Sequence, residues 1–332
     1  MTHGTQTIRI PSAPSWFSQP GEISLIAGPC SAETEEQVFA TAIEVKKIPQ
    51  LRFFRAGVWK PRTRPGTFSG SGDQALAWIA RVKKELSLPT MVEVATARHV
   101  ELALASGVDA LWVGARTVVN PFSVQEIADA LRGTDLPVFI KNPIVPDLGL
   151  WLGAIERIFS SGISKIAAIH RGFATYSETR LRYSPEWKIP ADLVAALPGL
   201  PLICDPSHIT GHRDLIEPMA EEALSHGVDG LMIETHVSPD AAWSDSKQQV
   251  SPAALLAMIN RLEKSRLGAN GNKELYLETL QARLRLLNQR SEDLRSAQDD
   301  TRSEILRVET NLVGANATDS DQNRLKNNNH IQ

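Results

Sequence analysis

The chain has 332 residues, 42% of them hydrophobic, and its formal net charge at pH 7 is −3. This charge balance does not indicate binding to nucleic acid, and no apolar run reaches the roughly 18 residues of a membrane span. Only two cysteines are present and the N-terminus lacks a secretion signal, so no disulfide framework and a cytoplasmic location are expected.

Residues 1–22 are polar and proline-containing, and are expected to form a short arm. Beyond them, eight apolar runs are typical of buried strands, at 24–29, 53–58, 90–95, 110–115, 137–141, 165–170, 201–204 and 230–234. An amphipathic stretch typical of a helix follows each run, at 35–48, 73–86, 97–106, 124–132, 150–161, 191–197, 215–226 and 252–264.

Strand and helix alternate eight times over about 240 residues, which predicts a (β/α)₈ barrel. An open doubly wound sheet is the structural alternative. The count of eight, and the polar residues that collect after the strands, favour the barrel. Gly107, Gly162 and Gly227 stand where helix C-caps are expected.

The composition changes after the predicted barrel, which covers residues 23–265. Residues 266–273 contain the glycine and asparagine of a linker. Residues 274–313 are charged and place leucines on one heptad frame, which predicts a helical appendage. The asparagine-rich residues 314–332 are expected to be disordered.

Polar side chains of two chemical kinds follow the predicted strands, where they would face the mouth of a barrel. One set offers a thiolate, an imidazole and two carboxylates: Cys30, His208, Glu234 and Asp245. Such a mixed set suits one divalent transition metal ion, Mn, Fe, Co or Zn, better than calcium. The other set consists of cations: Arg55, Lys60, Arg62, Arg116, Lys141 and Arg171. These would repel one another unless anions filled the mouth, so small, phosphorylated substrates are predicted.

Seven short motifs in this order resemble those of 3-deoxy-D-arabino-heptulosonate 7-phosphate (DAHP) synthase, the first enzyme of the shikimate pathway. They are Gly-Pro-Cys-Ser at 28–31, Lys-Pro-Arg-Thr at 60–63, Gly-Ala-Arg at 114–116, Lys-Asn-Pro at 141–143, His-Arg-Gly at 170–172, Asp-Pro-Ser-His at 205–208 and Ser-Asp at 244–245. The run 141–151 is similar to the subgroup often fused to a C-terminal chorismate mutase. The resemblance covers about residues 23–265 and implies a transferase.

The resemblance also implies roles for individual residues. The metal ligands would be Cys30, His208, Glu234 and Asp245. The residues that hold phosphoenolpyruvate would be Arg116, Lys141 and Arg171, with Lys60 and Arg55 contributing. Asp205 is expected among the substrate-binding residues, where it would position its neighbours rather than bind metal. Arg62 and Thr63 would meet erythrose 4-phosphate. Cys30 and His208 would belong to the catalytic residues because they bind the metal ion. Lys60 is the candidate proton donor to the new hydroxyl, and Glu93 is the candidate that orients the attacking water.

Several alternatives stay open. The synthase of 3-deoxy-D-manno-octulosonate 8-phosphate runs the same chemistry on the same fold, but typically has Lys-Ala-Asn-Arg-Ser where this chain has Lys60-Pro-Arg-Thr. A non-catalytic barrel that binds and regulates a chorismate mutase is the other functional alternative. His170 has a substrate role or a structural role, and His236 is a further candidate for the site.

The family resemblance further implies a homodimer or tetramer, with feedback inhibition by an aromatic end product or prephenate. A chorismate mutase of the related fusions needs three helices of about ninety residues, more than follow the linker here. A truncated, degenerate or purely associative helix is therefore expected rather than an active mutase.

Overall fold

The computed structural model describes residues 14–17, 22–61, 66–176 and 180–270. The chain divides into two compact units, Met1–Lys264 and Ser265–Gln332. The predicted helical appendage at 274–313 and the tail at 314–332 lie outside the described residues, and so do most of the predicted arm and the end of the linker.

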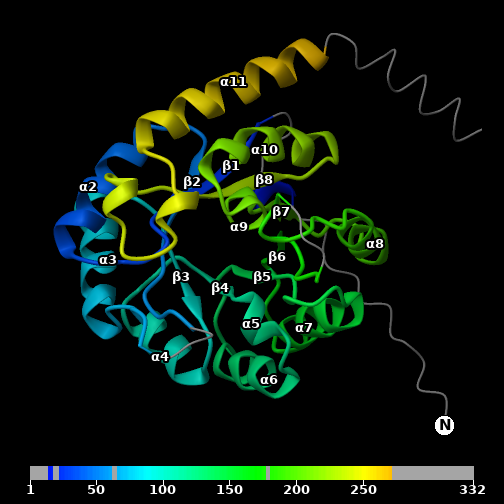
Figure 1. Cartoon of the computed structure of the whole chain (residues 1–332). Helices are drawn as coiled ribbons and strands as arrows, with labels where there is room; N and C mark the ends of the chain where they lie inside the picture. Colours follow the sequence, from blue (N-terminus) through cyan, green and yellow to red (C-terminus); the bar gives the residue numbers. More distant parts are fainter. Residues whose placement is uncertain (1–13, 18–21, 62–65, 177–179, 271–332) are drawn as a thin grey trace, which may run out of the picture. The chain divides into compact units, whose positions relative to one another are not determined.

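Eight parallel strands form a closed barrel in which each strand pairs with the next and β1 pairs with β8 (Figure 1). The strands are β1 Ser24–Gly28, β2 Leu51–Ala56, β3 Thr90–Val94, β4 Ala110–Val113, β5 Val138–Lys141, β6 Ile166–His170, β7 Leu202–Cys204 and β8 Gly230–Glu234. Since the ring is closed, the (β/α)₈ prediction is confirmed and the open sheet is excluded.

Helices surround the strands in the order that the sequence predicts. The main ones are α2 Glu35–Val45, α3 Asp73–Leu86, α4 Ala97–Ala105, α6 Pro121–Ala130, α7 Leu148–Ser160, α8 Lys188–Ala196, α10 Ile216–Ser225 and α11 Pro252–Asn270. Side-chain caps explain several starts, as where Thr34 accepts a hydrogen bond from the Gln37 amide at the head of α2. Gly107, Gly162 and Gly227 adopt positive φ angles of 73°, 100° and 80° just after their helices, which confirms the predicted caps.

Short elements stand between these helices. They are α1 Pro14–Phe17, α5 Ala115–Val118, α9 Pro206–Thr210 and the 3₁₀ turns Arg213–Leu215, Pro239–Ala241 and Ser246–Gln248. Helix α11 continues to Asn270, beyond the predicted end at Lys264, because an isolated glycine inside a helix costs only about 1 kcal/mol. None of the helices in the described part of the chain is long and apolar enough to cross a membrane.

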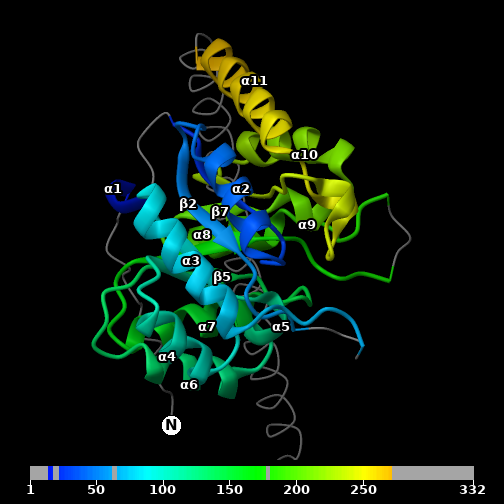
Figure 2. The same cartoon turned by 90° about the vertical axis from the view of Figure 1, so that its left-hand side faces the viewer.

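The barrel interior is filled by apolar side chains, and its amino-terminal end is covered by α1. The Phe17 and Trp16 rings lie 5.4 and 5.7 Å from the ring of Phe139, in edge-on contact. The Ser24 hydroxyl donates to the Phe17 carbonyl, which fixes α1 to the start of β1. Figure 2 shows α1 on one side of the barrel and the long loops after β2 and β6 on the other. The carboxyl ends of the strands are therefore the open end.

Candidate active site

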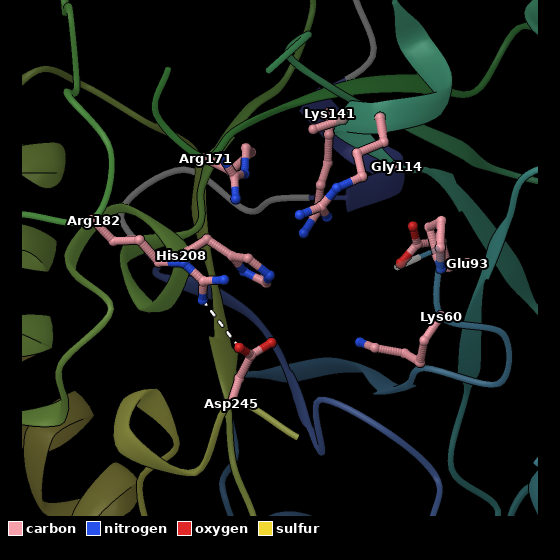
Figure 3. Close-up of a pocket in the computed structure, with 11 residues that line it drawn as sticks. Lys60, Glu93, Gly114, Lys141, Arg171, Arg182, His208 and Asp245 are labelled. Atoms are coloured by element: carbon pink, nitrogen blue, oxygen red, sulfur yellow. Dashed lines mark hydrogen bonds and ion pairs between the residues drawn. The ribbon is translucent and has the colours of Figure 1, made fainter. Parts of the chain in front are cut away.

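A cavity opens at the carboxyl ends of the strands, where a barrel of this type carries its chemistry. Its charged lining consists of Lys60, Glu93, Arg116, Lys141, Arg171, Arg182, His208 and Asp245. Figure 3 labels all of these residues except Arg116, and it shows the labelled side chains around one common space. The structure thus brings together residues that are up to 185 positions apart, as from Lys60 to Asp245.

The four predicted metal ligands meet beside this cavity. Donor atoms of Cys30, Glu234 and Asp245 all lie within 4.8 Å of one another. The Cys30 Sγ atom is 3.3 Å from Asp245 Oδ2, and His208 Nε2 is 3.7 Å from Glu234 Oε1. The thiol and the two carboxylates form one cluster, and the imidazole lies beside Glu234; such a mixed donor set is one that borderline divalent ions prefer.

The protonation of these donors suits a cation. Burial lowers the pKa of His208, so that its imidazole is neutral at neutral pH and free to bind through Nε2. Burial alone would raise the pKa of Glu234, but His208 and Arg55 outweigh it and the pKa is lowered. The pKa of Asp245 is also lowered, because Arg182 and His208 overcome the effect of burial. Both carboxylates are therefore ionised.

The thiol shows the opposite behaviour. Burial and the negative charge of Glu234 raise the pKa of Cys30 to about 12, so the thiolate requires a positive charge close by. A coordinated divalent ion provides such a charge. Glu234 Oε1 is buried and, apart from its ion pair with Arg55, has no hydrogen-bond partner among the described residues, which leaves a lone pair for coordination. The residues present thus fit a metal ion.

Asp205 sits behind the imidazole and fixes its orientation. Its Oδ2 atom lies 2.8 Å from His208 Nδ1 and 2.8 Å from Lys141 Nζ. Although burial acts to raise the pKa of Asp205, His208 and Lys141 hold it well below its ordinary value. With Nδ1 directed at this carboxylate, Nε2 is turned toward Glu234, as a metal-binding histidine requires.

Two of the predicted cations lie against the donor cluster. Lys60 Nζ donates to the Cys30 carbonyl at 2.7 Å and lies 3.1 Å from its sulfur. Arg55 is 1% exposed, lies 3.3 Å from Glu234 Oε1 and stacks over the Trp112 ring. Arg55 does not line the cavity, so its position is that of a buried counter-ion beneath the cluster.

The remaining predicted residues divide into two groups. Arg116, Lys141 and Arg171 line the cavity, and the Arg171 guanidinium lies 3.6 Å from the centre of the Tyr183 ring. Arg62 and Thr63, the residues predicted to meet the second substrate, lie outside the described residues.

Glu93 reaches the cavity because its neighbour is a glycine. It projects from β3, and a Cβ atom at position 114 would lie only 2.1 Å from Glu93 Oε1. Gly114 of the Gly-Ala-Arg motif therefore leaves room for the carboxylate beside β4. Burial acts to lower the pKa of Lys60, but Cys30, Glu234 and Glu93 outweigh it, so the pKa of this lysine is raised.

Sequence reasoning missed Arg182. Its Nη1 atom lies 3.1 Å from Asp245 Oδ1 and 2.7 Å from Gln248 Oε1, on the wall of the cavity. The sequence signal was two further arginines, Arg180 and Arg182, in the loop after the sixth strand.

His170 does not line the cavity. It is fully buried at the end of β6, with the Trp187 ring 4.9 Å and the Phe173 ring 5.7 Å away. Of its two predicted roles, this position favours the structural one. His236 is also absent from the cavity lining and lies 3.4 Å from Glu33.

Comparison with known proteins shows a consistent family relationship. Residues 19–266 match the model of the DAHP synthetase I family. The phospho-2-dehydro-3-deoxyheptonate aldolase of Thermotoga maritima is 28% identical over 244 residues, covering 74% of this chain and 70% of that protein. A 2-dehydro-3-deoxyphosphooctonate aldolase of Chelativorans sp. is 27% identical over 270 residues, covering 74% of this chain and 92% of that protein. The crystal structure of the DAHP synthase of Thermotoga maritima superimposes with a TM-score of 0.68 at 26% identity, covering 76% of this chain and 72% of that one.

Proposed function

The chain belongs to the DAHP synthetase I family, and we propose that its barrel mouth joins phosphoenolpyruvate, erythrose 4-phosphate and water into DAHP and phosphate. It is thus a 3-deoxy-7-phosphoheptulonate synthase, a transferase of aromatic biosynthesis. The single observation that carries the proposal is the cationic cavity beside the clustered donor atoms of Cys30, Glu234 and Asp245, with His208 next to Glu234.

The cationic wall binds phosphoenolpyruvate in this proposal. Arg116, Lys141 and Arg171 line one cavity and supply charge-assisted hydrogen bonds to its carboxylate and phosphate. Arg62 and Thr63 of the Lys-Pro-Arg-Thr motif bind the phosphate of erythrose 4-phosphate. Two phosphorylated substrates neutralise the positive wall, which is the reason for so many cations at one mouth.

Cys30, His208, Glu234 and Asp245 would hold one divalent ion of the Mn, Fe, Co or Zn type. When bound, such an ion polarises and orients the aldehyde as a Lewis acid. Asp205 supports the site by holding the His208 ring and the Lys141 ammonium in place.

The bond-making steps use Lys60 and Glu93. Carbon 3 of phosphoenolpyruvate attacks the aldehyde carbon, and Lys60, protonated because its pKa is raised, gives a proton to the new hydroxyl. Water then adds at carbon 2, oriented by the Glu93 carboxylate, which takes its proton. As the carbon–oxygen bond to phosphate breaks, the new hydroxyl at carbon 2 gives its proton to the leaving phosphate, which leaves the ketone of DAHP and inorganic phosphate.

Family membership also supports a homo-oligomer, dimer or tetramer, in the cytoplasm. An aromatic end product or prephenate is the proposed feedback inhibitor. Residues 274–313 are proposed to be an associative or truncated element without mutase activity.

The second candidate reaction is that of 2-dehydro-3-deoxyphosphooctonate aldolases, which use a five-carbon aldehyde. Its support is the match to one such protein, of which 92% is covered. The test is phosphate release from phosphoenolpyruvate with erythrose 4-phosphate or with arabinose 5-phosphate. We expect turnover with the four-carbon aldehyde and little with the five-carbon one. The reverse preference would refute the assignment, and no release with either would favour the non-catalytic barrel.

A further inference from the structure

The metal donors of this site are positioned by two different means. Glu234 is the last residue of β8 and pairs in register with Gly28 of β1, so the barrel itself fixes it. Cys30 follows β1 by two residues. Asp245, in contrast, lies eleven residues beyond β8 in a long loop. Its backbone has φ 46° and ψ 38°, a left-handed conformation that a non-glycine residue keeps only where its surroundings impose it.

A buried carboxylate in the first loop holds the residues just before Asp245. Glu33 Oε1 accepts a hydrogen bond from the Trp243 amide at 2.8 Å and one from the Ser31 hydroxyl at 3.2 Å. Glu33 Oε2 lies 3.4 Å from His236 Nε2. Since His236 Nδ1 accepts from the Ser238 amide, Nε2 carries the ring proton. Its 3.4 Å approach to Glu33 is within ion-pair distance but is not a hydrogen bond. The side chains of Glu33 and His236 are both 4% exposed, so water does not compete for these contacts.

A second set of contacts joins the same two loops. The hydroxyls of Ser31 and Ser244 lie 2.6 Å apart and are buried. Gln249 bridges the loops through its amide, which donates to the Ser244 carbonyl at 2.8 Å and accepts from the Cys30 amide at 3.0 Å. The two residues that precede Asp245 are thus tied, by side chain and backbone, to the loop that carries Cys30.

We propose that Glu33 is a positioning residue for the metal centre, which sets the distance between Cys30 and Asp245 by holding the loop after β8 against the loop after β1. Ser244 carries the second part of the same linkage. The inference rests on the proposed function, because it takes Cys30 and Asp245 as ligands. Glu33 does not line the cavity, so in this proposal it acts through the contacts between these two loops.

Glu33→Gln tests the role with little change in volume. The carboxylate accepts from two donors at Oε1 and faces a third at Oε2, whereas an amide turns an NH₂ group toward one of them. Ser244→Ala is the second variant, because it removes the 2.6 Å contact without touching Glu33. Glu217→Gln is the matched control, since it removes a carboxylate from an ion pair with Arg261 on the outer helices.

The measurement is a titration of the metal-free full chain with Co²⁺, followed by absorption, including the thiolate-to-cobalt charge-transfer band. We expect Co²⁺ affinity to fall about 10- to 100-fold in Glu33→Gln and in Ser244→Ala, as for other groups that orient metal ligands. Glu217→Gln should bind as the wild type does. The circular dichroism of each metal-free variant, with its thermal midpoint, separates weakened binding from unfolding.

If Glu33→Gln folds and binds Co²⁺ with wild-type affinity, the proposal is overturned. If Glu33→Gln does not fold, wild-type Co²⁺ affinity in Ser244→Ala overturns it instead. Cys30→Ala distinguishes this failure from failure of the metal site itself. If Cys30→Ala binds Co²⁺ as tightly as the wild type, the proposed ligand set is wrong and the positioning role falls with it. Loss of the charge-transfer band in Cys30→Ala, with weakened binding in both loop variants, supports the proposal.

Discussion

The buried imidazole of His170 makes the stability of the barrel depend on pH. The side chain is fully buried between the rings of Phe173 and Trp187. Burial, with a further contribution from the positive charge of Arg171, lowers the pKa of His170 to about 3. The folded chain therefore keeps this imidazole neutral over the whole range in which an exposed histidine takes up its proton.

The size of the effect follows from proton linkage. The unfolded chain binds the proton with a pKa near the ordinary value of 6.5, and the folded chain only near 3. The unfolded state thus holds more protons between these values, so stability is lost as the pH falls below about 6.5. Each pH unit in this window is worth about 1.36 kcal/mol, and lowering the pH from 6.5 to 5 costs about 2 kcal/mol.

Urea unfolding of the metal-free chain at pH 7.5 and pH 5, compared with His170→Gln, measures this cost. We expect the free energy of unfolding to fall between the two pH values by about 2 kcal/mol less in the variant than in the wild type. His212→Gln, at an exposed position, is the matched control for the loss of an imidazole. An identical pH dependence in His170→Gln and the wild type would refute the reasoning.

Three further substitutions test separate parts of the account. Lys60→Met should lower kcat about 10²- to 10⁴-fold while changing Co²⁺ affinity far less, and unchanged turnover would remove Lys60 from the mechanism. Asp205→Asn leaves the buried Lys141 ammonium without its carboxylate and should lower the free energy of unfolding by about 3–5 kcal/mol; a loss of about 1 kcal/mol or less, typical of an exposed pair, would contradict this. Phe139→Ala removes the ring that Trp16 and Phe17 of α1 contact, and should lower the free energy of unfolding by about 3–5 kcal/mol in the same assay. An unchanged urea midpoint would contradict a stabilising role for this aromatic cluster.

Helices whose apolar residues repeat with a clear helical period were predictable from the sequence, and the short helices were not. Helix α3 begins and ends where the sequence pattern places it, because its apolar face repeats over several turns. Helix α9 has only five residues, too few for a period. It did carry a capping signal, since Asp205 caps the His208 amide and Pro206 takes the first position.

The sequence predicted which residue types gather at the site better than it predicted how deep in the barrel each one lies. The residue types after each strand predicted a donor set and a group of cations, and the structure brings most of these residues to one end of the barrel. Alternation along β2 places Arg55 inside the barrel, but its position below the cavity depends on the packing of Trp112. The roles of Arg182 and Glu33 depend on how the loops after β6 and β1 meet the loop after β8, which no local pattern encodes.

Phosphate release from phosphoenolpyruvate plus erythrose 4-phosphate, before and after removal of metal by a chelator, tests the central claim most directly. We expect release that requires both substrates, stops after chelation and returns with Mn²⁺ or Co²⁺, but not in Cys30→Ala. Full release from the chelated protein, or equal release without the aldehyde, would contradict the account.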